Sequence, residues 1–213
     1  MRKFLKGLLW TVGLLLLVAL VLRAVVLDVW TVPDDPILAA STAPTLAAGD
    51  VVVVLTRGKP TFGELVRCAD PDSPRSHVVG RIAGVGSKND VVETDGHTLV
   101  VNGTRYDAES ACPDPTLTIK HPSTGVDVQI RCDVVAMGGG RHFRGVSPKG
   151  PLERKLRNEV RPDTVFLLSD NRNFHDDSRD YGSLPHDACK RMVFRLWGKG
   201  GWGDEERRLS FVR

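Results

Sequence analysis

The chain has 213 residues and a formal net charge of +3, with 41% hydrophobic and 26% charged residues. That balance is typical of a folded globular protein and excludes a disordered chain. The first 27 residues hold four basic and no acidic groups, and the remaining 186 hold 25 basic and 26 acidic groups. Because the larger part is nearly neutral, a nucleic-acid-binding protein is disfavoured.

The N-terminal segment is typical of a membrane anchor. Residues 8–22 are apolar apart from Thr11 and Gly13. As a helix, residues 4–27 would measure about 36 Å, and a bilayer core is about 30 Å thick. Three of the first six residues are basic, which predicts an N-terminus in the cytoplasm and a single pass through the cytoplasmic membrane. Residues 1–30 are therefore expected to form the anchor, with the lipid bilayer as a partner. Residues 31–213 are expected on the outer, periplasmic side.

A cleaved secretory signal is the alternative for this segment. The first small-residue cleavage pattern, at residues 38–40, lies more than ten residues beyond the apolar run, which is too far for an ordinary site. We favour the uncleaved anchor, and both interpretations export the rest of the chain.

Four cysteines lie in the exported part, where an even number suggests disulfides. Cys112 and Cys132 bracket a predicted hairpin that turns at residues 122–125, so we predict that they pair. Cys68 and Cys189 either form a second bridge or remain buried thiols. No spacing among the cysteines and histidines is typical of a metal site.

The exported part is rich in short β signals and in glycine and proline. We expect a mainly β, antiparallel domain with a possible subdomain insert over residues 104–160. Residues 152–160 are the one segment with a helical pattern. The predicted strands cover residues 50–56, 77–85, 90–94, 98–102, 116–120, 126–131, 164–168 and 192–197.

Two motifs point to chemistry. The first, STAPTL at residues 41–46, places Ser41 in a proline-containing loop just after the anchor and before a strand. The second is the polar segment SDNRNFHDDSRDYGSLP at residues 169–185, directly after a predicted strand. We call this second segment the late box.

In these motifs the chain resembles the bacterial type I signal peptidases, which are membrane-anchored serine proteases. The family pattern around the nucleophile is S-M-x-P-T-L, and its late pattern is G-D-N-R-x-x-S-x-D-S-R followed by G-x-x-P. Residues 80–86 resemble a third family segment, K-R-V-I-G-L-P-G-D. The resemblance implies the signal-peptidase fold, Ser41 as nucleophile, signal peptides of exported preproteins as substrates, and no metal or organic cofactor. It also implies a shallow apolar groove that selects small residues at the first and third positions before the cleavage site.

The main departure from the family concerns the general base. The family uses a lysine of lowered pKa, but Gly80 stands at that position, and no lysine occurs between residues 59 and 88. Arg81 cannot replace it because a guanidinium stays protonated. His175 stands where the family has a serine that contacts the lysine. We hypothesise that His175 takes the proton from Ser41, with Asp176 or Asp177 orienting the ring.

Other positions carry smaller implications. By resemblance Asp177, Arg179 and Arg81 are scaffold residues that hold the active-site loop through ion pairs. Ala39 replaces a hydroxyl that assists the oxyanion site in some members, which predicts a slower enzyme. The histidines at positions 97, 121, 142 and 186 are expected at the surface.

We therefore expect a serine endopeptidase that removes signal peptides. The alternative is a catalytically dead relative that keeps the groove and binds exported peptides. A membrane-tethered β domain with only a structural role ranks last, because it leaves the polar identities of the late box unexplained.

Overall fold

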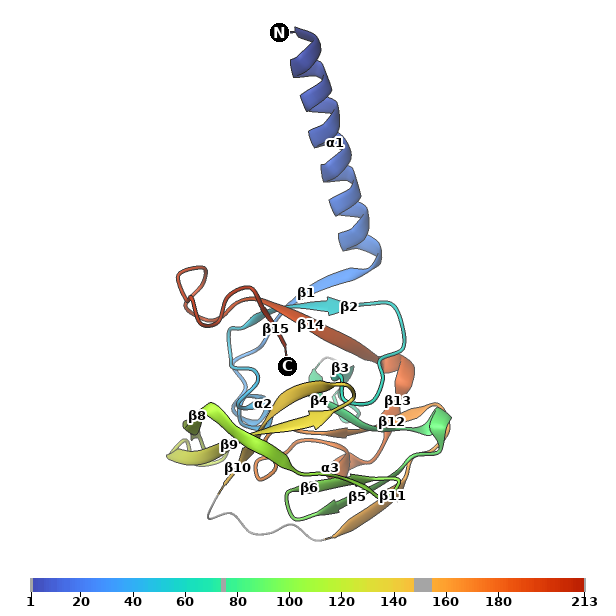
Figure 1. The fold of residues 1–213 in the computed structure, drawn as a ribbon, viewed down its shortest axis with the longest axis vertical. Coiled ribbons are helices and arrows are strands. Elements are labelled where there is room, and N and C mark those ends of the chain that lie inside the picture. The colour runs from blue at the N-terminus through green and yellow to red at the C-terminus, as the bar shows by residue number, and fades with distance from the viewer. Residues whose placement is uncertain (1, 74–75, 148–154, 213) are drawn as a thin grey trace.

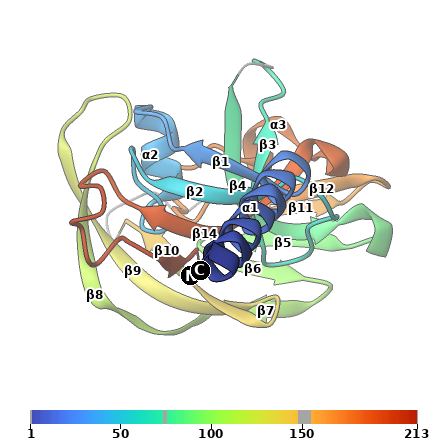
Figure 2. The same cartoon turned by 90° about the horizontal axis from the view of Figure 1, so that it is seen from above.

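The computed structural model describes residues 2–73, 76–147 and 155–212 (Figure 1). A long helix, α1 (Arg2–Val25), extends away from a β-rich body, and the view from above looks down this helix onto the strands (Figure 2). In the part of the chain that is described, no helix is long and apolar enough to cross a membrane. The predicted transmembrane span over residues 4–27 is thus not supported, although a helix does form there.

The described residues of the body form three antiparallel sheets. The largest has the order β1-β2-β14-β3-β4-β12-β13, with β15 paired to β14; the others have the orders β10-β9-β8 and β11-β5-β6-β7. The strands of the largest sheet are β1 (Leu27–Thr31), β2 (Val51–Leu55), β3 (Leu65–Ala69), β4 (His77–Val85), β12 (Thr164–Leu168), β13 (Leu184–Pro185), β14 (Cys189–Trp197) and β15 (Ser210–Phe211). The other strands are β5 (Val91–Asp95), β6 (Thr98–Val101), β7 (Thr104–Tyr106), β8 (Ala108–Lys120), β9 (Asp127–Met137), β10 (Gly140–Val146) and β11 (Leu156–Glu159).

Helices are few in the body. They are α2 (Pro36–Thr42), α3 (Ser178–Tyr181) and the short 3-10 turns η1 (Gly86–Lys88) and η2 (His186–Ala188). The mainly β, antiparallel class predicted from the sequence is confirmed, and each of the eight predicted strands falls on a strand. The predicted hairpin is also confirmed, because β8 and β9 pair across a turn in which the Gly125 amide donates to the His121 carbonyl.

The helix predicted over residues 152–160 is wrong where it can be examined. Residues 156–159 form β11, which pairs antiparallel with β5, and residues 152–154 lie outside the described part. Exposure alternates along β11, as expected for an edge strand. Pairing with β5 thus overrides a weak local helical pattern.

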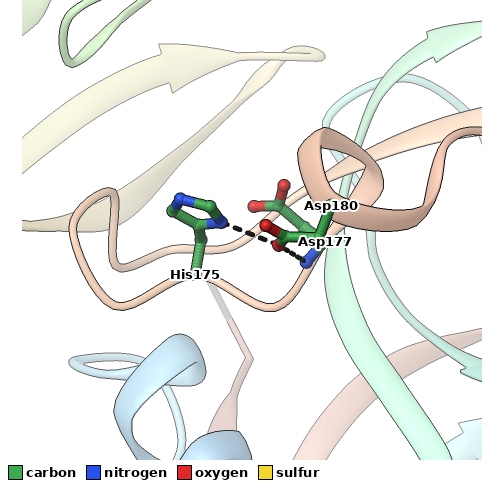
Figure 3. Close-up of side chains that lie close together, drawn as sticks. All are labelled: His175, Asp177 and Asp180. Carbon is green, nitrogen blue, oxygen red and sulfur yellow. Dashed lines mark hydrogen bonds and ion pairs between the residues drawn. The ribbon is translucent and has the colours of Figure 1, made fainter. Parts of the chain in front are cut away.

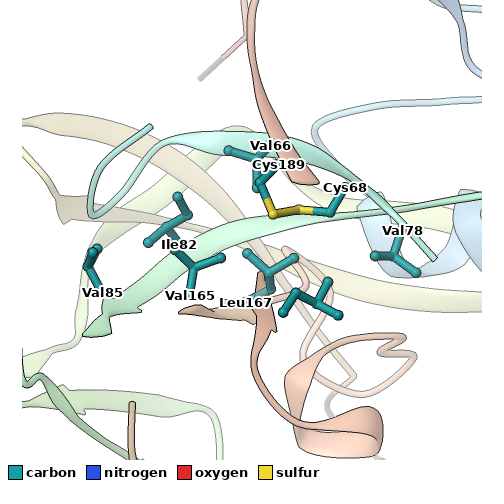
Figure 4. Close-up of a cluster of buried hydrophobic side chains, with 9 residues drawn as sticks. Val66, Cys68, Val78, Ile82, Val85, Val165, Leu167 and Cys189 are labelled. Atoms are coloured by element: carbon teal, nitrogen blue, oxygen red, sulfur yellow. A yellow bond between two sulfur atoms is a disulfide. The ribbon is translucent and has the colours of Figure 1, made fainter. Parts of the chain in front are cut away.

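The disulfides join strands in two places. Cys112 pairs with Cys132 between β8 and β9, as predicted. Cys68 also pairs with Cys189, which settles the alternative that the sequence left open. This second bridge links β3 to β14 inside a buried cluster that includes Val78, Ile82 and Leu167 (Figure 4). The bridge therefore ties the two halves of the largest sheet together near β4.

Candidate active site

Ser41 lies on the short helix α2 and not in the loop that the sequence predicted. Asp35 caps this helix, because its Oδ1 accepts hydrogen bonds from the amides of Ile37 (2.8 Å) and Leu38 (2.9 Å). Pro36 follows at the first helical position, where its fixed φ favours a helix and its missing N–H costs nothing. The sequence signal of an N-cap aspartate followed by proline was present and could have predicted the helix.

Packing fixes the position of α2 on the sheet. Leu38 is buried in a cluster with Val79 of β4 and Leu65 of β3. At the other end the helix stops at Ala43, which precedes a proline and adopts an extended conformation. Ser41 therefore stands at the last turn of a helix held against β4.

The Ser41 hydroxyl is buried and hydrogen-bonded inside its own helix. The side chain is fully inaccessible to solvent, and its Oγ donates to the Leu38 carbonyl over 3.1 Å. The Thr42 hydroxyl donates to the same carbonyl over 2.7 Å. The Ser41 carbonyl accepts from the Asn171 amide over 2.9 Å, so a backbone bond joins α2 to the late box.

His175 forms a close pair with an aspartate that sequence reasoning missed. Its Nδ1 lies 2.8 Å from Oδ2 of Asp180, so Asp180 contacts the ring where Asp176 or Asp177 was expected (Figure 3). The Asp180 carboxylate also accepts from the Asp177 amide, which completes a capping box at the start of α3. The spacing of Asp177 and Asp180 was the available signal. A carboxylate at Nδ1 favours the tautomer whose Nε2 carries the lone pair that a general base needs.

Ser41 and His175 are not joined in this conformation. Among the described residues no hydrogen bond links them, since the Ser41 Oγ bonds to Leu38. A Ser–His contact requires the Ser41 side chain to rotate away from the Leu38 carbonyl. The loss of one neutral hydrogen bond costs about 1 kcal/mol.

Asp177 and Arg179 form a buried ion pair. The Arg179 Nε and Nη2 donate to the two carboxylate oxygens of Asp177 over 2.9 and 2.7 Å, and the Ser169 amide donates to Asp177 Oδ2 over 2.7 Å. Burial alone would raise the pKa of Asp177, but the hydrogen bonds and charge of Arg179 and the Ser169 amide hold it below its ordinary value. This geometry agrees with a scaffold role for the pair.

Three ligand-type atoms of His175, Asp177 and Asp180 lie within 4.8 Å of one another, a spacing at which a metal ion could be held. Both Asp177 oxygens already accept from Arg179, and the Asp180 Oδ2 contacts both His175 and the Asp177 amide. A metal ion bound by Asp177 would therefore have to displace a bidentate ion pair.

A second buried ion pair connects the STAPTL motif to the sheet. The Arg81 Nε and Nη2 donate to Asp170 over 2.7 and 3.1 Å, and the Thr45 hydroxyl donates to the same carboxylate. Arg81 belongs to β4, Thr45 to the STAPTL motif and Asp170 to the late box. The two sequence motifs and the third family-like segment thus meet at one carboxylate.

Gly80 is tightly packed against β12. A Cβ at this position would lie 3.1 Å from the Leu168 carbonyl oxygen and 3.2 Å from the Leu167 Cβ. A side chain at residue 80 therefore requires β12 to shift. The strand arrangement around Gly80 is adapted to the absence of a side chain.

Replacing Gly80 by alanine is expected to lower the free energy of unfolding by about 1–3 kcal/mol, because the added methyl overpacks the β4–β12 contact. Urea denaturation measures this change. Gly140→Ala is the matched control, because its nearest neighbour is the Met137 carbonyl oxygen at 4.0 Å. Equal effects of the two substitutions would contradict the assignment of tight packing to Gly80.

A cleft of about 600 Å³ opens beside α2, lined by side chains that include Ile37, Leu38, Asp176 and Tyr181. Asp176 is half-buried in it. Burial, followed by the charges of Asp180 and other aspartates, raises the pKa of Asp176 to about 6. Three further aspartates, Asp35, Asp70 and Asp72, also line the cleft, so its surface is acidic as well as apolar.

Asp176→Asn is expected to stabilise the protein by about 1 kcal/mol at pH 7 and to have no effect near pH 4. The folded-state pKa of about 6 exceeds the ordinary 3.8, so the wild type binds a proton more tightly when folded and loses stability as pH rises between these values. Solvent screening of a half-buried group keeps the effect below the full value of the shift. Thermal unfolding at both pH values measures it. The exposed Asp187→Asn serves as control, and a stabilisation independent of pH would refute the explanation.

Two histidines expected at the surface are buried. His142 on β10 is 2% exposed, and burial together with Arg81, Arg172 and Arg144 lowers its pKa to about 2. His186 is also buried, with its Nε2 2.7 Å from the Pro60 carbonyl oxygen. His142 closely follows a run of glycines and His186 follows a proline, which is why the sequence predicted exposed turns, and only the tertiary contacts reveal their burial.

Comparison with known families identifies the chain. The model of the signal peptidase family, peptidase S26, matches residues 5–197. The chain therefore belongs to the signal peptidase family. A search of curated proteins found no match.

Proposed function

We propose that this protein is a membrane-attached serine endopeptidase that removes signal peptides from exported preproteins, with Ser41 as nucleophile and His175 as general base. The observation that carries the proposal is the His175–Asp180 pair in the late box, beside a backbone hydrogen bond from Asn171 to Ser41. Membership of the signal peptidase family supplies the substrate class.

In the proposed reaction the Ser41 Oγ attacks the scissile carbonyl carbon while His175 Nε2 accepts the hydroxyl proton. The tetrahedral intermediate collapses as the imidazolium protonates the leaving amine, which leaves an acyl group on Ser41. Water, deprotonated by His175, then attacks the ester and regenerates the serine. Asp180 holds the ring and stabilises the imidazolium. Ala39 offers no side-chain donor to the oxyanion, so the backbone N–H of Ser41 remains the clear donor and the reaction is slow.

The cleft beside α2 is the proposed place of the substrate. Ile37 and Leu38 lie four and three residues before Ser41 and contribute apolar surface to it. Small side chains before the cut would fit against this surface. Gly80, Arg81, Asp177 and Arg179 act in this proposal through packing and ion pairs and not through proton transfer.

The proposal places the body outside the cytoplasmic membrane, with α1 as the attachment. The described leucines of α1 are exposed, and the helix contacts the body chiefly through β1. Two disulfides agree with an oxidising compartment. Fractionation of cells, followed by protease treatment of the intact outer surface, tests this location.

Cleavage of a model preprotein by the purified full chain in lipid tests the activity. The expected result is a product cut after a small residue, lost completely in Ser41→Ala. The alternative function is peptide binding without cleavage, favoured by Gly80 at the lysine position and by the buried Ser41 hydroxyl. Binding of the signal peptide by a wild-type chain that leaves it intact would establish that alternative.

A further inference from the structure

We propose that Arg207 is a positioning residue that holds the loop following Ser41. Arg207 lies in the C-terminal segment, residues 198–213, which extends beyond the family match at residues 5–197. The consequence for catalysis rests on the proposed function, whereas the consequence for the loop does not.

Arg207 contacts a buried carboxylate at the end of the loop that joins α2 to β2, residues 43–50, which we call the nucleophile loop. Asp50 is fully inaccessible, and Arg207 donates to both of its oxygens, from Nε to Oδ1 over 3.2 Å and from Nη2 to Oδ2 over 2.5 Å. Arg195 of β14 donates its Nε to Oδ2 over 3.1 Å. Two guanidinium groups therefore enclose one carboxylate, a geometry that fixes orientation as well as charge.

Asp50 and Arg195 in turn hold the loop backbone. The Ala47 amide donates to Asp50 Oδ2 over 3.0 Å, and Arg195 Nη2 donates to the Thr45 carbonyl. The Thr45 hydroxyl donates to Asp170, the late-box carboxylate paired with Arg81. A continuous set of hydrogen bonds thus leads from the C-terminal segment to the loop, four residues from the nucleophile, and on to the late box.

The C-terminal segment has its own anchors to the body. β15 pairs with β14, and Phe211 packs edge-to-face on Phe194 with ring centroids 5.4 Å apart. Lys199 lies against Gly49, where a Cβ would come within 3.0 Å of the lysine side chain. The segment is therefore docked beside the loop by packing, and Arg207 adds the polar contact that reaches Asp50.

Arg208 provides a matched control one residue away. It donates to the Trp202 carbonyl and to Glu205, both inside the C-terminal segment. Arg207→Gln and Arg208→Gln remove the same charge from the same segment, but only the first removes a partner of Asp50.

The decisive measurement is amide hydrogen exchange in the full chain. Arg207→Gln is expected to raise the exchange rate of the Ala47 amide about tenfold, since it weakens the charge-assisted contact that fixes its acceptor. The amides of Thr45 and Leu46, which donate to the Thr42 carbonyl, are expected to follow. Exchange in β5 and β6 should stay unchanged, as should all exchange in Arg208→Gln.

A kinetic measurement on the same variants tests whether Arg207 affects catalysis. Arg207→Gln should lower kcat for preprotein cleavage about fivefold to tenfold with little change in KM, and Arg207→Lys should recover part of it. Unchanged exchange at Ala47 would overturn the proposal, as would faster exchange spread evenly over the chain, which indicates global destabilisation. Local exchange together with an unchanged kcat would confine Arg207 to the loop structure and refute its catalytic importance. If the wild type cleaves nothing, the exchange result still decides whether Arg207 holds the loop.

Discussion

His175→Ala is expected to lower kcat/KM for preprotein cleavage by a factor of about 10³ or more. The imidazole that pairs with Asp180 is the proposed proton acceptor, and the substitution removes it. General-base catalysis raises a reaction rate by a factor of about 10²–10⁴. The measurement is initial-rate kinetics with a model preprotein in lipid. Ser41→Ala, measured in parallel, defines the background rate when cleavage activity is lost completely.

Asp180→Asn separates the orientation of the ring from the base itself. The asparagine side-chain oxygen can still accept a hydrogen bond from the Asp177 amide and preserve the cap of α3. Because asparagine carries no negative charge, it no longer stabilises an imidazolium. We expect a decrease in kcat that approaches the effect of His175→Ala, with an intact fold by circular dichroism. The exposed Asp187→Asn is the control and should retain full activity. If His175→Ala keeps wild-type cleavage while Ser41→Ala has none, another group is the base and the Ser/His proposal fails.

The second large effect concerns stability. Arg81→Met is expected to lower the free energy of unfolding by about 3–5 kcal/mol, because it leaves the Asp170 carboxylate buried without its cation. The side chains of this pair are 4% and 1% exposed, and Thr45 depends on the same carboxylate. Urea denaturation measures the change, and cleavage is expected to fall with it because the nucleophile loop loses its support.

The control for Arg81 is Arg105→Met. Arg105 pairs with Asp107 at the surface, where both side chains are more than half exposed, so its loss should change stability by less than about 1 kcal/mol. Adding Asp170→Leu to Arg81→Met should recover part of the stability, since removal of both charges leaves no unpaired ion. A loss for Arg81→Met no greater than that of Arg105→Met would show that the pair is not essential to the fold.

Several features of the fold followed from local sequence patterns. Runs rich in valine and other β-branched residues predicted the eight strands, because such side chains fit a pleated, half-buried surface. The Cys112–Cys132 bridge followed from its position around a hairpin, whose register brings the two residues together. Helix α2 was missed although its capping signal was present, since the polar and proline residues around it were assigned to a loop.

The contacts of the candidate site could not be predicted from the sequence, and one of its residues, Asp180, was missed. The two motifs pointed to Ser41, His175, Asp177 and Arg179 as candidates, and the family-like segment at residues 80–86 added Arg81. The partner of His175 is Asp180 because the turn of α3 brings residue 180 back over residue 177, a consequence of helix geometry that sequence proximity alone conceals. The buried state of His142 likewise depends on residues that are distant in the chain, since Arg81 of β4 lies close enough to lower the pKa of its ring.

The β-rich class and the hairpin with its disulfide were predictable from the sequence alone, because they depend on short-range periodicity and turn chemistry. Only the tertiary structure decided that Cys68 pairs with Cys189, that residues 156–159 form a strand and that Arg207 reaches Asp50. These contacts join residues up to 157 positions apart. Their formation depends on how whole strands align in the sheets, which no local pattern encodes.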